Sequence, residues 1–250
     1  MHILLSNDDG IHSAGLRALA EACVSAGHRV TICAPDRERS ASGHALTMRD
    51  PLYAERVDYD GIDAWAISGT PVDCVRLGLL SLAQGPVDLV ASGINHGPNL
   101  GTDTLYSGTV AAAMEALVLD HAALAVSLCS KHKMEHMESA ARWACRVIAG
   151  MAARGLDRTH LYNLNVPALP FDEVKGVRPA RLSRKRYTNG YEKLTSPYGR
   201  DHYWLDSWPE EVGEEPGSDE ALTRAGYATL TPLTWSLMDE SALTGLEGEW

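Results

Sequence analysis

Short apolar runs alternate with amphipathic segments along the first two thirds of the chain. Apolar runs typical of buried strands occupy residues 3–7, 28–34, 87–92, 122–128 and 161–166. Apolar residues at helical spacing predict helices before Gly27, after a capping box formed by Thr70 and Asp73 with Pro71 at the first helical position, and over 109–120 and 137–154. Residues 53–67 have the pattern of a hairpin. This alternation predicts an α/β fold with a doubly wound, Rossmann-like, mostly parallel sheet.

The alternation stops between about Gly176 and Leu233. This stretch holds a basic run over 181–186, the aromatic residues Tyr203, Trp204 and Trp208, and the acidic run PEEVGEEPGSDE. Charge runs are usually solvated, whereas clustered aromatic residues favour burial against a partner subunit. The sequence therefore predicts an α/β core over residues 1–175. Residues 176–250 are expected to form a β-rich extension, with hairpins and a C-terminal segment, that takes part in oligomerisation.

Composition narrows the class of protein. The 250 residues are 45% hydrophobic and 22% charged, as in ordinary globular proteins, and the net charge is −11. Such a charge disfavours duplex nucleic acid or an anionic membrane as a partner. The five cysteines never form a CxxC pair, acidic residues begin at Asp8, and no apolar run has the roughly 20 residues of a membrane span. A cytoplasmic protein with reduced thiols is expected.

Two adjacent carboxylates, Asp8 and Asp9, follow the first apolar run directly. Ligands of open α/β sheets bind at the carboxyl ends of the strands. Neighbouring buried carboxylates repel each other, and a divalent cation such as Mg²⁺ removes that cost. The alternative is a solvent-facing helix cap, which aspartate also favours.

Oxygen-rich residues also follow two further strands. Ser40 and Ser42 come after the second, and Asn95 and Asn99 after the 87–92 run. Loops of this kind converge at one edge of a parallel sheet, where hydroxyl and amide oxygens complete a hard, open ligand set. Each of these residues taken alone is also a common turn residue.

A glycine-rich loop enters a helix through Ser107, Gly108 and Thr109. Free N–H groups at a helix N-terminus, next to a hydroxyl and a residue without a side chain, are suited to binding an anion. Ordinary capping by serine is the alternative, although a glycine in the first turn lowers helix propensity without capping.

Other motifs fit less well. His132, Glu135 and His136 match the HxxEH spacing of zinc peptidases, but they lie at a strand-to-helix junction beside lysines. The first strand–helix turn has Gly10 and Gly15 without GxGxxG, and its two aspartates would repel a pyrophosphate. The nucleotide-triphosphate loop GxxxxGK[ST] and the nucleophile elbow GxSxG are absent from the sequence.

Taken together, these segments resemble the survival protein E (SurE) family of metal-dependent nucleoside-monophosphate phosphatases. The resemblance covers nearly the whole chain and rests on ILLSNDDG, APDRERS, GTPVDC, SGINHGPNLG, YSGTVAAAMEA, NLNVP and GYATLTPL in that order. It implies that the metal ligands are Asp8, Asp9, Ser40 and Asn95. It also implies that Asn99 and Ser107, Gly108 and Thr109 hold the phosphate. Two positions depart from the family pattern: Ala41 replaces a glycine and Ala14 a frequent proline.

The resemblance implies a 5′-nucleotidase, also active on 3′-nucleotides, in which Asp8 and Asp9 are catalytic. One divalent cation, Mg²⁺ or Mn²⁺, is the expected cofactor, a nucleoside monophosphate the substrate, and a homodimer or homotetramer the assembly. The preferred base and the residue that acts as general base are left open. Two other functions also stay open: a nucleotide-binding regulatory module without catalysis and, more remotely, a zinc peptidase using His132, Glu135 and His136.

Overall fold

The computed structural model describes residues 1–130, 135–184, 187–209, 215–239 and 242. Its helices are α1 (Ala14–Ser25), α2 (Pro71–Leu77), α3 (Gly108–Val118), α4 (Met137–Ala153) and α5 (Asp219–Arg224), with single helical turns η1 (Gly78–Leu82), η2 (Gly101–Leu105) and η3 (Phe171–Glu173). The strands are β1 (His2–Ser6), β2 (Arg29–Pro35), β3 (Ala54–Val57), β4 (Asp63–Ile67), β5 (Leu89–His96), β6 (Ala122–Cys129), β7 (Leu161–Pro167), β8 (Val177–Pro179), β9 (Tyr187–Thr195), β10 (Asp201–Pro209) and β11 (Ala228–Leu233).

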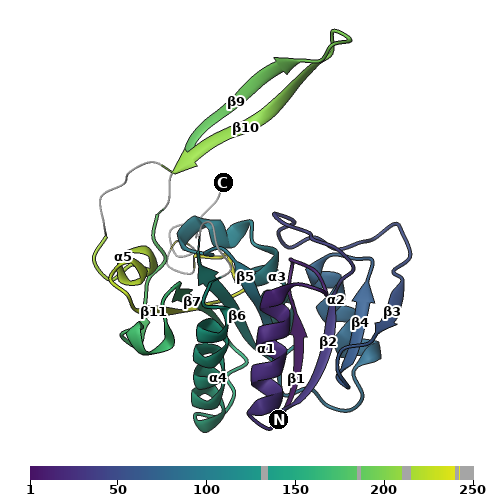
Figure 1. Ribbon diagram of the computed structural model, residues 1–250, viewed down its shortest axis with the longest axis vertical. Coiled ribbons are helices and arrows are strands. Elements are labelled where there is room, and N and C mark those ends of the chain that lie inside the picture. Colours follow the sequence, from purple (N-terminus) through teal and green to yellow (C-terminus); the bar gives the residue numbers. More distant parts are fainter. Residues whose placement is uncertain (131–134, 185–186, 210–214, 240–241, 243–250) are drawn as a thin grey trace, which may run out of the picture.

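Nine of these strands form one mixed sheet in the order β3-β4-β2-β1-β5-β6-β7-β11-β8 (Figure 1). The six strands from β4 to β7 in this order pair in parallel, whereas β3 is antiparallel to β4, and β11 to β7. The mostly parallel α/β fold predicted from the sequence is confirmed. None of the helices in the described part of the chain is long and apolar enough to cross a membrane.

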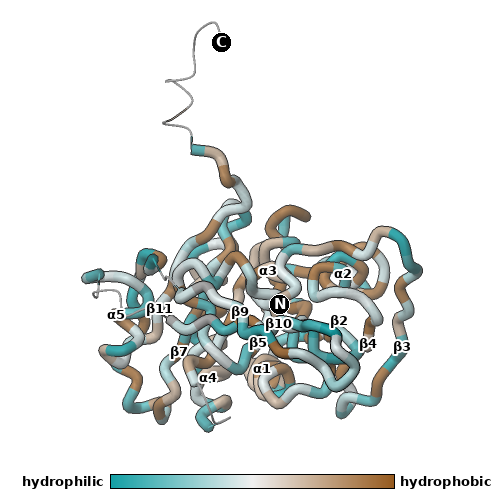
Figure 2. The backbone as a smooth tube through the Cα atoms, turned by 90° about the horizontal axis from the view of Figure 1, so that it is seen from above, coloured by the Kyte–Doolittle hydropathy of each residue, from teal (hydrophilic) through white to brown (hydrophobic). Residues whose placement is uncertain are grey.

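Helices cover both faces of the sheet. Seen from above, α1 and α4 lie on one side of the strands and α2 and α3 on the other (Figure 2). Because successive side chains of a strand point to opposite faces, Ile3 and Leu5 of β1 join the core beneath α1 and α4, and Leu4 joins the core beneath α2 and α3. This burial on both faces is why the strand sequences are almost continuously apolar.

Strand β5 is longer than the apolar pattern indicates. The pattern ends at residue 92, but β5 runs on to His96 by pairing Asn95 with Ser127 of β6 beyond a register shift. Polar residues can stay in this strand because its end lies at the rim of the sheet. The extension carries Asn95 along the carboxyl end of β5 instead of leaving it in a loop.

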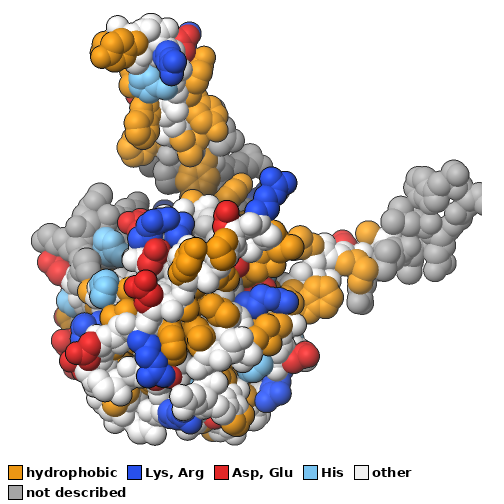
Figure 3. Space-filling model, turned by 90° about the vertical axis from the view of Figure 1, so that its right-hand side faces the viewer, with side chains coloured by type: hydrophobic (Ala, Val, Ile, Leu, Met, Phe, Trp, Pro, Cys, Tyr) orange, Lys and Arg blue, Asp and Glu red, His pale blue; other side chains and the backbone are white. Residues whose placement is uncertain are grey.

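The chain after Gly176 divides between the main sheet and a separate hairpin. Strands β8 and β11 complete the sheet edge, and β9 and β10 pair only with each other. The sequence pattern did not indicate α5, a short helix capped by Ser218 whose buried Asp219 accepts hydrogen bonds from Gly101 N (2.7 Å) and Ser183 N (2.8 Å). The hairpin projects from the body with hydrophobic side chains along its length (Figure 3).

Candidate functional site

The loop after β1 places two carboxylates at the carboxyl edge of the sheet. Asn7 holds this loop in shape, because its Nδ2 donates to Gly10 O (3.1 Å) and Ser13 Oγ (2.6 Å) while its Oδ1 accepts from Gly10 N (3.2 Å). Gly10 turns the chain at φ +98°, a conformation that other residues rarely adopt. No role for Asn7 was predicted from the sequence, although its place directly before the two aspartates was a signal.

Asp8 is buried against the N-terminus of α3. Its Oδ1 accepts a hydrogen bond from Thr109 Oγ1, and burial raises the pKa of the Asp8 carboxyl. The Thr109 hydroxyl and the backbone N–H groups of Thr109 and Gly108 oppose this rise. A β-carbon on Gly108 would lie only 2.7 Å from Asp8 Cβ and 2.9 Å from Asp8 Oδ2. Only glycine therefore lets this carboxylate approach the helix so closely.

Asp9 lies beside Asp8 and is less buried. Burial and then the charge of Asp8 raise the pKa of Asp9 to about 6, although a hydrogen bond from His96 N (3.3 Å) acts in the opposite direction. Two carboxylates that are both costly to ionise are a favourable place for a divalent cation. Among the described residues, no three His, Cys, Asp or Glu side chains gather as a metal-binding group. A cation at Asp8 and Asp9 would therefore also need neutral oxygen ligands.

The loop after β2 lies against this pair. Arg39 N donates to Asp8 O (2.7 Å), which ties the loop to the first one. The Ser40 side chain is exposed and donates to Glu38 Oε1 (2.6 Å). The Ser42 hydroxyl is buried, makes no hydrogen bond in the described part of the chain, and lies 3.1 Å from the β-carbon position of Gly108. The sequence pattern indicated Ser40 and Ser42 together, and in the structure it is Ser42 Oγ that lies near the start of α3, where Asp8 also lies.

Two buried carboxylates hold this loop in place through hydrogen bonds. Asp73 at the start of α2 accepts from Thr47 Oγ1 (2.6 Å) and Thr70 N (2.9 Å), which completes the capping box predicted from the sequence. Glu115 on α3 accepts from His44 Nε2 (2.9 Å) and from an arginine of α2. Burial opposes ionisation of Glu115, but these hydrogen bonds outweigh it and lower its pKa. The contacts to Thr47 and His44 could not be inferred from local pattern.

Asn95 and Asn99 occupy different environments. Asn95 Nδ2 donates to Gly97 O (2.9 Å). The side-chain oxygen of Asn95, Oδ1, points away from this hydrogen bond. Asn99 is buried, and its Nδ2 donates to Ser127 Oγ (2.8 Å). The side chains of Asn163 and Asn165 on β7 donate to Asn99 O (2.9 and 3.0 Å), and Asn165 Oδ1 accepts from Asn99 N (2.9 Å). For Asn163 and Asn165, the signal available in the sequence was their alternate spacing within an apolar strand.

The start of α3 combines capping with the carboxylate contact. Ser107 Oγ accepts from Val110 N (3.1 Å) and is the N-cap of α3. Gly108 and Thr109 face Asp8, as described above. The structure thus brings the start of α3 against Asp8. Binding of a phosphate by Ser107, Gly108, Thr109 and Asn99 stays a prediction.

The zinc-peptidase motif lacks its required setting. Glu135 and His136 precede α4, which begins at Met137, and His136 has a left-handed backbone conformation. His132 lies outside the described residues. Because HxxEH chemistry depends on both histidines projecting from one helix, this geometry does not support a peptidase site.

Comparison with known proteins identifies the family. The family model described as Survival protein SurE matches residues 3–189. This chain belongs to the SurE family. It is 45% identical to 5′-nucleotidase SurE of Synechococcus sp. (strain JA-3-3Ab), over 99% of this chain and 96% of the relative, and 46% identical to 5′-nucleotidase SurE of Gloeobacter violaceus, over 99% and 95%. The crystal structure of the SurE protein from Aquifex aeolicus superposes with a TM-score of 0.86 at 36% identity and covers 99% of this chain and 98% of its own. The family resemblance seen in the sequence motifs is confirmed.

Proposed function

We propose that this SurE chain is a 5′-nucleotidase that hydrolyses nucleoside 5′-monophosphates, and also 3′-monophosphates, to a nucleoside and phosphate. The observation that carries the proposal is the Asp8–Asp9 pair at the carboxyl edge of the sheet, packed on the N-terminus of α3. Relatives that align over nearly their full length are named 5′-nucleotidase SurE, which supports the same reaction class here.

One divalent cation, Mg²⁺ or Mn²⁺, is part of this proposal. Asp8, Asp9, Ser40 and Asn95 would hold it, since carboxylate, hydroxyl and amide oxygens are the ligands that these ions prefer. The raised pKa values of the two aspartates fit this role, because a nearby cation would favour their charged forms. When bound, the cation would neutralise charge on the phosphoryl group as the P–O bond breaks.

The chain's own residues position the reactants. Asp8 and Asp9 orient a water molecule for in-line attack on phosphorus, while Thr109 keeps Asp8 in place through its hydroxyl. Asn99 and the start of α3 at Ser107, Gly108 and Thr109 receive the phosphate. The Ser42 hydroxyl, which is buried and has no hydrogen-bond partner among the described residues, donates a hydrogen bond to a phosphate oxygen bound at the start of α3.

Assembly as a homodimer or homotetramer in the cytoplasm completes the proposal. Tyr203, Trp204 and Trp208 on the β9–β10 hairpin are at least 60% exposed. Aromatic side chains gathered on a projecting hairpin favour burial against a second copy of the chain. The five free cysteines are compatible with a reducing compartment.

Phosphate release from a panel of nucleoside monophosphates tests the activity. We expect EDTA to abolish turnover and Mg²⁺ or Mn²⁺ to restore it. Asp8→Asn should lower kcat by at least ~100-fold and should remove the thermal stabilisation by added Mn²⁺. Asp120→Asn is the matched control, because Asp120 lies at the far end of α3 in a left-handed conformation that asparagine accepts. Full activity of the chelated enzyme would reject the metal site, and nucleotide binding without hydrolysis would indicate a regulatory module.

A further inference from the structure

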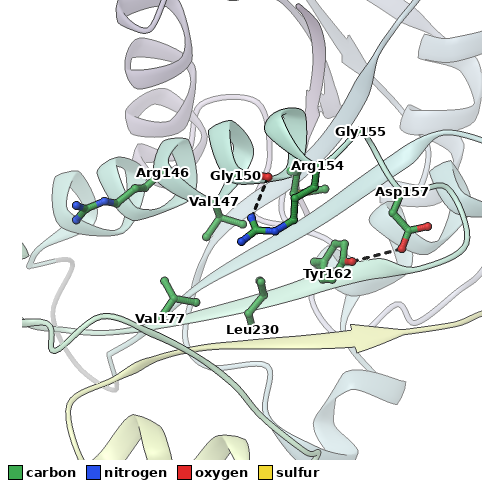
Figure 4. A pocket seen from close by; sticks show the side chains of 10 residues that line it. Arg146, Val147, Gly150, Arg154, Gly155, Asp157, Tyr162, Val177 and Leu230 are labelled. Atoms are coloured by element: carbon green, nitrogen blue, oxygen red, sulfur yellow. Dashed lines mark hydrogen bonds between the residues drawn. The ribbon is translucent and has the colours of Figure 1, made fainter.

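A cavity lies away from Asp8 and Asp9, between α4 and the edge of the sheet (Figure 4). It has a volume of 370 Å³, within the range of about 300–1,000 Å³ that is usual for small-molecule sites. Tyr162, which lines it, is at the amino end of β7, whereas the two aspartates follow the carboxyl end of β1. The cavity is therefore separate from the proposed active site.

Apolar side chains form much of the lining. Val147 and Met151 come from α4, Val177 from β8 and Leu230 from β11, and the ring of Tyr162 continues this surface. Val177 and Leu230 are only partly buried, although they pack against the core beneath α4. A ligand with an apolar body would cover these side chains and remove them from water.

Arg154 provides the positive charge. Its exposed side chain folds back along the last turn of α4, where Nη1 donates to Gly150 O (3.0 Å) (Figure 4). A guanidinium carries five N–H donors, and this bond uses one of them. Among the described residues Arg154 has no carboxylate within salt-bridge distance, whereas Arg17, Arg76 and Arg224 each have at least one. An arginine with unused donors beside apolar surface is suited to a carboxylate or phosphate.

Asp157 at the far end of the cavity does not cancel this charge by direct pairing. Its carboxylate accepts from the hydroxyl and backbone N–H of Thr159 (2.6 and 2.7 Å), from His160 Nδ1 (3.0 Å) and from Tyr162 OH (3.3 Å). These donors, three from its own loop and one from β7, engage the Asp157 carboxylate. Arg146, at the other end of α4's lining surface, adds a second guanidinium, which lies 5.1 Å from the ring of Trp143.

We propose that this cavity binds a small organic anion. The carboxylate or phosphate of the ligand pairs with Arg154, and its aromatic or aliphatic body lies on Val147, Val177 and Leu230. Such a ligand matches the cavity because its anionic group meets a guanidinium and its body meets an apolar surface. The rest of the chain is acidic, with a net charge of −11. General repulsion by such a chain would otherwise keep anions away.

Amide chemical shifts in the full-length protein test this proposal. The probe is 3-phenylpropionate, and the matched control ligand is 3-phenylpropanamide, which keeps the shape without the charge. We expect the acid to shift the amides of Gly150, Gly155 and Tyr162 saturably, with a Kd on the order of 0.1–1 mM. The amide should bind at least ~10-fold more weakly. A phosphonate with the same skeleton shows whether a phosphate group is preferred to a carboxylate.

Two variants separate the site from general surface charge. Arg154→Gln should weaken binding of the acid at least ~10-fold. Arg158→Gln removes the same charge from the exposed loop nearby without touching the cavity and should leave the Kd within about twofold. Three results would each overturn the proposal: an equal loss of binding in both variants, equal binding of acid and amide, or no response of the lining amides. The last result is expected if a second copy of the chain covers the cavity.

Discussion

Replacing Gly108 by alanine tests the contact between α3 and the Asp8 carboxylate most directly. The new β-carbon would lie 2.7 Å from Asp8 Cβ and 2.9 Å from Asp8 Oδ2. Non-bonded carbon atoms prefer separations of about 3.5–4.0 Å. Because Gly108 belongs to the helix backbone, the Asp8 side chain has to move by about 1 Å.

The expected effect on stability is small and the effect on activity is large. Overpacking costs about 1–3 kcal/mol, and the better helix propensity of alanine returns ~1 kcal/mol of this. A net loss of up to about 2 kcal/mol corresponds to a fall in Tm of up to ~8 °C for a domain of this size. Displacing a catalytic group by about 1 Å can lower the rate ~100-fold.

Phosphate release from AMP with saturating Mg²⁺ or Mn²⁺, measured beside a thermal melt, separates these effects. We expect kcat/KM of Gly108→Ala to fall ~100-fold while the protein stays folded at 25 °C. Gly150→Ala is the control, because its β-carbon meets only the flexible end of Arg154 at 3.0 Å. A kcat/KM for Gly108→Ala within about threefold of wild type, in a folded protein, would show that the Asp8–α3 contact does not matter for catalysis.

Three further predictions use other parts of the molecule. Asp9 has a pKa of about 6, whereas an unperturbed aspartate has a pKa of 3.8, so ionisation of Asp9 destabilises the metal-free fold above pH 6. This penalty fades as the pH falls toward 4. Asp9→Asn should therefore raise the Tm in EDTA at pH 7.5 but not at pH 4, and an equal shift at both pH values would contradict this origin. Ser42→Ala should raise KM for AMP about 2–10-fold with a smaller change in kcat, and Ser42→Thr should restore it; an unchanged KM would place the hydroxyl away from the phosphate. Light scattering should give at least twice the 27.0 kDa chain mass, and a clean monomer at working concentration would reject the proposed assembly.

The chain's repeated element pattern and its acidic turn could be inferred from sequence because both are local properties. Short apolar runs predicted β1, β2, β6 and β7 to within a few residues. The Thr70–Asp73 capping box was predicted because capping depends on residues three apart. The position of Asp8 and Asp9 directly after an apolar strand placed them at the carboxyl edge of the sheet, since that edge is shared by all parallel strands.

Tertiary packing alone decided how distant segments complete the site. The sequence could not show that Ser42 Oγ is buried beside Asp8 while Ser40 is exposed, because the course of the loop depends on its contacts with Asp73 and Glu115 on two separate helices. It also could not show that β11 pairs antiparallel with β7, or that the cavity beside Arg154 exists. These features arise from contacts between residues far apart in the chain, whose energies depend on the assembled fold and leave little periodic signal in the sequence.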